Sequence, residues 1–416
     1  MKKNLTQWLY YLSETHQSAR HSSLDRLRPL VNKLTIQQFS CPVITVGGTN
    51  GKGTTVCALE QIYLQAGYRV AAYTSPHLID FRERLRINNQ LVSEETWCAA
   101  FEKIEAARGQ LCLSFFEYTT FAAFLICQQL ELDLVILEVG LGGRLDAVNL
   151  MENSCAIITS IDLDHLDWLG DTREKIGAEK ADIIRKICVC GDPQPHSIIE
   201  KIAQEKQAKY YQITRDFNYE ITENAWSYHG KFNNYDQLKK PELPIRNIAC
   251  ALMALEILQP KLPVTAEHIA AAMPKIRLRG RFETLQQVPR IIVDVAHNPE
   301  AARYLREKIM GLKLEAQVRF VFAALKDKLV IEMAAVFRDL PLAWYLGDLS
   351  GLPRGLSAGQ VAELLATAGI DSCYTFDSVE AALAAAVVQS EPEDSIVVWG
   401  SFHAVAVATQ WIAKRN

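Results

Sequence analysis

The chain has 416 residues, more than one hydrophobic core usually supports, so two domains are expected. Hydrophobic residues make up 49% of the sequence, which is enough to fill both cores. The net charge of −4, from 44 basic and 48 acidic residues mixed along the chain, excludes an extended basic surface for nucleic acid and favours small-molecule substrates.

The N-terminal segment does not resemble a targeting signal. Residues 1–8 have a basic start, but no apolar stretch of seven or more residues follows, and no run of about 18 apolar residues occurs anywhere. The ten cysteines contain no C-x-x-C pair, and most lie in apolar patterns. Cys188 and Cys190 could form a ligand pair, but buried reduced thiols are the favoured interpretation. The sequence thus predicts a soluble, cytoplasmic protein without a membrane segment.

Residues 43–55 form the most informative motif. An apolar run, Val43–Val46, leads into a glycine-rich loop that ends with Lys52, Gly53, Thr54 and Thr55. This pattern predicts a buried strand, a loop whose backbone N–H groups approach phosphates, and a helix that points its positive dipole at them. Lys52 is expected to contact the β- and γ-phosphates, and Thr54 to reach Mg²⁺. The spacing differs from the common P-loop, because Gly53 separates the lysine from the hydroxyl.

Strands and helices alternate after this loop, which predicts a doubly wound, mostly parallel sheet. Expected strands are 42–46, 69–73, 134–139, 155–160 and 187–190, and expected helices are 52–66, 94–107, 118–130 and 172–185. Residues 205–245 are less regular and predict a small antiparallel patch, followed by a helix over 246–258.

A basic segment without clear periodicity, residues 274–283, marks the expected domain boundary. We therefore predict an ATP-binding domain at 1–280, a linker at 281–288 and a smaller, Rossmann-like α/β domain at 289–416. Expected strands of the second domain are 290–295, 318–323, 343–346 and 395–399.

Polar residues follow the predicted strands, where parallel α/β sheets bind ligands. Ser75–Leu78 follows the second strand, Glu138 ends the third, and Asp162–His165 follows the fourth. Oxygen ligands and a histidine beside a triphosphate suit Mg²⁺. Three glycines in Gly140–Gly143 then release the backbone next to Glu138, which predicts a substrate-facing loop.

These motifs together resemble the bacterial bifunctional dihydrofolate synthase/folylpolyglutamate synthase family, which is related to the Mur ligases. The segments that carry the resemblance, over almost the whole chain, are 8–12, 47–55, 75–78, 115–117, 137–149, 159–170, 280–282, 294–299 and 400–403. It implies a ligase that uses ATP to convert a carboxylate into an acyl phosphate, which the amine of glutamate then attacks. Substrates would be dihydropteroate, reduced folates, glutamate and ATP, and a monomer is expected.

The resemblance also implies roles for individual residues. Two Mg²⁺ ions would be held by Thr54, Ser75, Glu138, His165 and a carbamylated Lys180. ATP would contact Thr49, Asn50, Gly51, Lys52, Gly53, Thr54, Thr55, Asn247, Arg281, Asp294 and His297. Phe116, Asp146 and Ala147 would line the pterin site. Lys52, Lys180, His297 and Asp294 would serve catalysis, with His297 or Asp294 as the base, in a cleft between the domains.

Two departures from the family pattern leave alternatives open. Asp182 stands where relatives have glycine after the modified lysine, and Ser22–Leu27 replaces a Leu-Gly-Leu-Glu-Arg stretch next to the pterin site. The second departure keeps open an enzyme that only extends folate glutamates. The first is the one hint of a non-catalytic protein that binds folate and ATP.

Overall fold

The computed structural model describes residues 2–15, 23–311 and 317–415, and it divides into two compact units. Unit 1 comprises residues 1–161 and 168–277, and unit 2 comprises residues 162–167 and 278–416. The division follows Arg277, close to the expected boundary. Residues 281–288, expected as a linker, instead contain a strand of unit 2, because Glu283–Gln287 pairs with the strand that follows it.

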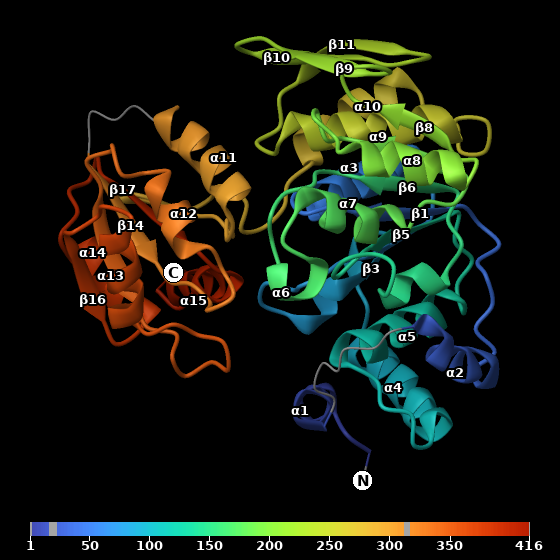
Figure 1. Ribbon diagram of the computed structural model, residues 1–416, viewed down its shortest axis with the longest axis horizontal. Coiled ribbons are helices and arrows are strands. Elements are labelled where there is room, and N and C mark those ends of the chain that lie inside the picture. The colour runs from blue at the N-terminus through green and yellow to red at the C-terminus, as the bar shows by residue number, and fades with distance from the viewer. Residues whose placement is uncertain (1, 16–22, 312–316, 416) are drawn as a thin grey trace. The chain divides into compact units, whose positions relative to one another are not determined.

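Unit 1 is built on an eight-stranded sheet with the order β4-β3-β2-β5-β1-β6-β7-β8 (Figure 1). Its strands are β1 Val43–Gly47, β2 Val70–Tyr73, β3 Leu85–Ile87, β4 Gln90–Leu91, β5 Leu134–Glu138, β6 Cys155–Ile158, β7 Ile187–Cys190 and β8 Lys209–Gln212. All neighbours from β2 to β8 pair in parallel, and β3 and β4 form an antiparallel edge. Strands β1, β2, β5 and β6 are buried along their whole length, as expected for parallel strands covered on both faces.

Helices and a second sheet complete unit 1. The helices are α1 Leu5–Thr15, α2 Arg28–Lys33, α3 Lys52–Gln65, α4 Glu94–Arg108, α5 Phe115–Cys127, α7 Arg173–Ala181, α8 Ser197–Glu205, α9 Ile245–Leu258 and α10 Ala266–Ala272, and the short α6 Leu166–Leu169 spans the division. Strands β9 Asn218–Ile221, β10 Ala225–His229 and β11 Asn234–Lys239 form the expected antiparallel patch. Residues 209–212, expected in that patch, instead extend the main sheet as β8.

Helices α5 and α7 differ most from their expected limits. Helix α5 begins at Phe115 rather than Tyr118, because Ser114 and Glu117 form a capping box. Helix α7 ends at Ala181, four residues earlier than expected, with Asp182 at its C-cap. The Asp182 carboxylate accepts a hydrogen bond from Lys206 at 2.9 Å. This contact directs Asp182 toward Lys206.

Unit 2 contains a six-stranded sheet with the order β12-β13-β17-β14-β15-β16. Its strands are β12 Glu283–Gln287, β13 Arg290–Val293, β14 Val318–Phe322, β15 Ala343–Gly347, β16 Cys373–Phe376 and β17 Ser395–Trp399, and its helices are α11 Pro299–Met310, α12 Val330–Ala335, α13 Ala358–Thr367, α14 Val379–Val388 and α15 Phe402–Ala413. Among the described strands of unit 2, only β12 pairs antiparallel with its neighbour.

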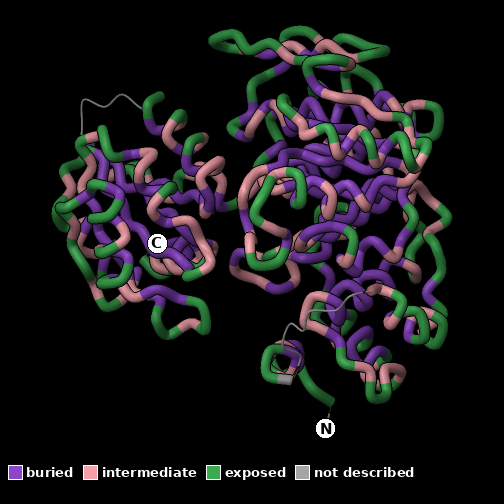
Figure 2. Tube along the Cα trace, in the orientation of Figure 1, coloured by how far each residue is buried: buried purple, intermediate pink, exposed green. Residues whose placement is uncertain are grey.

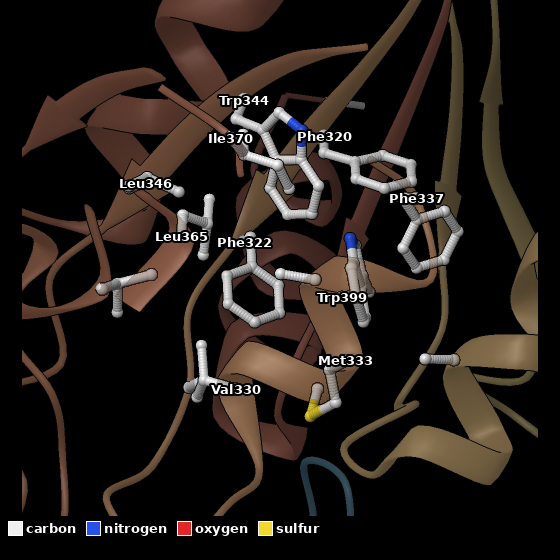
Figure 3. Close-up of a cluster of buried hydrophobic side chains, with 14 of the residues drawn as sticks. Phe320, Phe322, Val330, Met333, Phe337, Trp344, Leu346, Leu365, Ile370 and Trp399 are labelled. Atoms are coloured by element: carbon white, nitrogen blue, oxygen red, sulfur yellow. The ribbon is translucent and has the colours of Figure 1, made fainter. Parts of the chain in front are cut away.

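Each unit has its own core, with buried strands at the centre and exposed residues at the surface (Figure 2). In unit 2 the core is rich in aromatic rings, and Phe320, Phe322 and Phe337 surround Trp399 (Figure 3). The ring centroids of Phe322 and Trp399 are 4.6 Å apart. No described helix is long and apolar enough to cross a membrane.

Candidate active site

The phosphate loop of unit 1 connects β1 to α3, and the end of β6 holds its shape. The backbone N–H of Thr49 donates to the Ser160 carbonyl at 2.8 Å, and that of Asn50 donates to the Ser160 hydroxyl at 3.2 Å. The Thr159 hydroxyl donates to the Asn50 carbonyl at 2.6 Å. These contacts preorganise the loop before any phosphate binds.

Two glycines of this loop have no room for a side chain. Gly48 has φ +140°, and an added Cβ would lie 1.9 Å from the Thr159 hydroxyl oxygen. Gly51 has φ +85°, and an added Cβ would lie 2.3 Å from the Asn247 amide nitrogen. Asn247, on α9, therefore lies against the loop. Helix α3 begins at Lys52 without a side-chain cap, so its first-turn N–H groups can serve phosphate oxygens.

Two predicted catalytic lysines converge on one oxygen of the loop. The Lys52 ammonium donates to the Gly48 carbonyl at 3.0 Å and to the Thr49 carbonyl at 3.1 Å. The Lys180 ammonium, on α7, donates to the same Gly48 carbonyl at 2.9 Å. Lys180 is buried, with 5% of its surface exposed. Helix α7 thus brings a second cation to the phosphate loop across about 130 residues of sequence.

The predicted metal ligands of unit 1 lie at the carboxyl edge of the sheet. Glu138 ends β5, is buried, and accepts a hydrogen bond from the Ser75 N–H at 3.0 Å. Thr54 is buried in the first turn of α3. Among the described residues, no three His, Cys, Asp or Glu side chains are grouped closely enough to hold a metal. A magnesium site here would therefore use Glu138 with hydroxyl groups, phosphate oxygens and a modified Lys180, which are hard oxygen ligands.

The predicted pterin residues surround the glycine loop after β5. Asp146 accepts hydrogen bonds from the N–H groups of Gly140 and Leu141, at 2.9 and 3.0 Å, and from that of Val148 at 3.0 Å. Burial raises the pKa of Asp146 to about 7, although these hydrogen bonds oppose the shift. The Phe116 ring packs against Gly140, where an added Cβ would lie 2.6 Å away. Asp146 therefore shapes the loop, and Ala147 is buried beside it.

The altered N-terminal segment lies beside this loop. Residues 24–27 form a short 3₁₀ helix, and Ser22 lies outside the described residues. Arg26 forms an ion pair with Glu117, which directly follows Phe116. The segment therefore reaches the start of α5 and the predicted pterin residues.

Unit 2 contains the remaining predicted residues, namely His165, Arg281, Asp294 and His297. The Asp164 carboxylate lies between the two histidines, 3.8 Å from the His165 Nε2 atom and 3.7 Å from the His297 Nε2 atom. The Lys328 ammonium pairs with it at 2.8 Å. Burial alone would raise the pKa of Asp164, but the charges of His165, Lys328 and His297 hold it below its usual range.

Two groups of unit 2 have shifted pKa values. Burial, aided by the charge of Lys328, lowers the pKa of His297 to about 4, so its imidazole is neutral at pH 7. Burial raises the pKa of Asp294. The Asp294 carboxylate already accepts hydrogen bonds from the Phe282 and Ala296 N–H groups, each at 2.8 Å. The Arg281 guanidinium lies 5.4 Å from the centre of the Phe402 ring.

Comparison with known proteins places the chain in a family. The Mur ligase middle domain matches residues 46–240, and the Mur ligase glutamate ligase domain matches residues 280–402. The dihydrofolate synthase/folylpolyglutamate synthase of Escherichia coli is 40% identical over 99% of this chain and 96% of its own length. The chain belongs to the dihydrofolate synthase/folylpolyglutamate synthase family. The Haemophilus influenzae protein of the same name is 37% identical over 97% of this chain and 96% of its own.

Solved structures of this family share the fold. Escherichia coli FolC in complex with DHPP and ADP matches with a TM-score of 0.94 at 40% identity, covering 100% of this chain and 99% of that one. The bifunctional folylpolyglutamate synthase/dihydrofolate synthase with Mn, AMPPNP and L-glutamate bound matches with a TM-score of 0.92 at 39% identity, covering 100% and 98%. The predicted family and fold class are thereby confirmed.

Sequence reasoning missed part of the unit 2 cluster. It named His165 and His297 as functional residues but gave no role to Lys328 or to Asn298, whose amide donates to Asp164 at 3.3 Å. A signal was present, because Lys326, Asp327 and Lys328 follow β14 at the carboxyl edge of its sheet. Because parallel sheets bind ligands at the carboxyl ends of their strands, charged residues at this place are candidates for the site.

Proposed function

We propose that this enzyme adds L-glutamate to dihydropteroate, forming dihydrofolate, and also extends the glutamate chain of tetrahydrofolates, with release of ADP and phosphate. Family membership supports the ligase chemistry, since the chain matches its relatives over nearly their whole length. The observation that carries the proposal is the preorganised loop at 47–55 between β1 and α3, next to strand β5, which pairs with β1 and ends at Glu138 beside the Ser75 N–H.

The first chemical step activates a carboxylate, because carboxylate oxygen is a poor leaving group. The substrate oxygen attacks the γ-phosphorus of ATP, and the bond between that phosphorus and the β,γ-bridging oxygen breaks. Lys52 and the N-terminus of α3 stabilise the phosphate charge as it shifts toward ADP, which is catalysis by positioning and electrostatics. Two bound Mg²⁺ ions would add positive charge, with Thr54, Ser75, Glu138, His165 and carbamylated Lys180 as the proposed ligands.

The second step joins the amine of glutamate to the acyl phosphate and expels phosphate. The amine must lose a proton, and we assign His297 as the acceptor in preference to Asp294. The His297 imidazole is neutral at pH 7, whereas both Asp294 oxygens already accept backbone hydrogen bonds. Retention of ligation by a His297→Ala, Asp294→Ala double variant would contradict both assignments. Arg281 and Asn247 are proposed to contact the nucleotide.

The substrate site is proposed to use Phe116 and the loop that Asp146 shapes. Phe116 offers an aromatic surface for a pterin ring, and Asp146 keeps Gly140 and Leu141 in place. We further propose that the enzyme acts as a cytoplasmic monomer on small molecules. Size-exclusion chromatography with light scattering tests the monomer, which a stable dimer mass would contradict.

The decisive experiment measures ATP-dependent incorporation of labelled glutamate, with Mg²⁺ and bicarbonate present. Dihydropteroate and a reduced folate monoglutamate are supplied in separate reactions. Incorporation with both acids is the expected result. Incorporation with the folate alone would limit the enzyme to chain extension and direct attention to residues 22–27. Incorporation with neither acid would favour a protein that only binds folate and ATP.

A further inference from the structure

Three arginines alternate in the segment that leads from the Ser75 loop into β3, and the middle one differs from its neighbours. Arg82 pairs with Asp80 at 2.7 Å, and Arg86 pairs with Glu60 at 2.8 Å. Arg84 is buried, with 8% of its surface exposed. Within the described ranges of the chain, no carboxylate forms an ion pair with Arg84.

The surroundings of Arg84 are aromatic and weakly polar. Its Nε atom donates to the Nδ1 atom of His77 at 2.9 Å. Its guanidinium carbon lies 5.3 Å from the centre of the Phe115 ring and 5.8 Å from that of the Phe81 ring. The Arg84 side chain also forms a hydrogen bond with Tyr73, and Glu138 attracts it electrostatically, but burial outweighs both contributions and lowers the pKa of Arg84.

A guanidinium stays charged in a protein, so this burial carries a cost that the protein itself does not fully offset. A bound anion would supply the missing negative charge. His77 engages Nε and Tyr73 takes one further hydrogen bond, so the remaining N–H groups of the two terminal nitrogens can donate in parallel to two oxygens of one group. This geometry suits a carboxylate or a phosphoryl group better than it suits a single hydroxyl.

Arg84 lies at the same edge of the sheet as the proposed reaction site. Tyr73 at the end of β2 pairs with Leu85, the residue after Arg84. The centroid of the Tyr73 ring is 6.1 Å from that of Phe116, the proposed pterin contact. Ser75, two residues after Tyr73, donates to Glu138. Arg84 therefore sits among the residues assigned to the pterin and to the metal.

We propose that Arg84 binds the reacting carboxylate of the acid substrate and stays paired with the same group when it becomes an acyl phosphate. This inference rests on the proposed function and adds the residue that recognises the acid. Arg84 would hold the carboxylate while one of its oxygens attacks ATP, and the aromatic rings of Phe81 and Phe115 would exclude water from the ion pair.

The test compares binding of dihydropteroate with binding of its carboxamide analogue, by isothermal titration calorimetry in the presence of ADP. We expect the wild-type enzyme to prefer the carboxylate by about 10- to 100-fold, as for hydrogen bonds to a charged group. Arg84→Gln should abolish this preference while leaving ADP affinity unchanged. Arg82→Gln, which removes a half-buried charge two residues away, is the matched control and should keep the preference.

Several outcomes would overturn the inference. A full carboxylate preference in Arg84→Gln would do so, as would a selective loss of AMPPNP affinity relative to ADP, which would assign Arg84 to the nucleotide. If Arg84→Gln does not fold, Arg84→Lys retains the positive charge but lacks the two parallel N–H donors of the guanidinium. It should therefore reduce the preference for the carboxylate. Equal binding of acid and carboxamide by the wild-type enzyme would refute the inference without any variant.

Failure of this inference can be told apart from failure of the proposed function. Glutamate incorporation by the wild-type enzyme tests the function alone. If incorporation occurs and the carboxylate preference is independent of Arg84, only the role of Arg84 is wrong. If no incorporation occurs but the preference requires Arg84, the chain binds the acid without ligating it.

Discussion

The repulsion between the Lys180 and Lys52 ammonium groups allows the effect of carbamylating Lys180 on stability to be estimated. Each ammonium nitrogen lies about 3 Å from the Gly48 carbonyl oxygen, so the two nitrogens are at most about 6 Å apart. At an effective dielectric constant of about 20, two positive charges at that separation repel by about 3 kcal/mol. Lys180 is 5% exposed, so solvent screens this repulsion poorly.

Carbamylation would reverse the sign of this interaction. The neutral Lys180 amine attacks carbon dioxide, a nitrogen–carbon bond forms, and a proton is released. The product carries one negative charge, so repulsion from Lys52 becomes attraction of similar size. We therefore expect bicarbonate to stabilise the protein. For a domain of this size, each kcal/mol raises Tm by about 2–4 °C, and we expect a rise of at least that amount.

The assay is thermal unfolding in carbon dioxide-free buffer and in bicarbonate at the same pH and ionic strength. Lys180→Met, which keeps an apolar stem without the amine, is the control and should show no bicarbonate effect. Labelled bicarbonate should also give a carbamate carbon signal in ¹³C NMR spectra of the wild-type protein alone. Equal responses of the two proteins, or the absence of that signal, would refute the reasoning.

Three further predictions concern single sites. Gly51→Ala should weaken ATP binding at least about tenfold, measured by calorimetry, because its Cβ would meet Asn247 at 2.3 Å and its φ of +85° disfavours alanine; unchanged affinity would contradict this. Trp399→Ala should lower the free energy of unfolding by about 3–5 kcal/mol in urea denaturation, since Trp399 is fully buried; a loss below about 1 kcal/mol would show that the cavity collapses. Asp146, with its pKa raised to about 7, binds a proton in the folded state that the unfolded state releases near its ordinary value of 3.8. Its contribution to stability is therefore complete below about pH 4 and is lost as the pH rises to 7. Compared with Asp146→Asn, the wild-type protein should lose stability between about pH 4 and pH 7 in denaturant titrations, and a constant difference would refute the raised pKa.

Local pattern predicted the elements whose residues are buried on both faces. The strands at 43–47, 134–138 and 187–190 are continuous apolar runs, so the sequence alone located them within a residue or two. The errors occurred where pairing with a neighbouring strand, rather than the hydrophobic pattern of the segment, decides the structure. Strand β12 consists mostly of polar residues and has no apolar face. It forms a strand because β13 provides backbone hydrogen-bond partners. Strand β8 was assigned to the wrong sheet for the same reason, since its partner is β7.

The candidate site shows the same limit. The loop at 47–55, Glu138 and the glycine run were recognisable because their composition and position after strands are unusual. Arg84 and Lys328 were not, because a single basic residue in a charged segment is ordinarily solvated. Only the structure shows that Arg84 is buried without a carboxylate ion pair among the described residues and that Lys328 is paired with Asp164.

By itself, the sequence determined that this protein has a phosphate loop on a parallel sheet and belongs with the folate ligases, because these properties depend on neighbours along the chain. The tertiary structure decided which distant groups share one position: Lys180 with Lys52 at the Gly48 carbonyl, and Asn247 against Gly51. The physical reason is that burial and charge pairing depend on distances in space, which residue spacing along the chain does not specify.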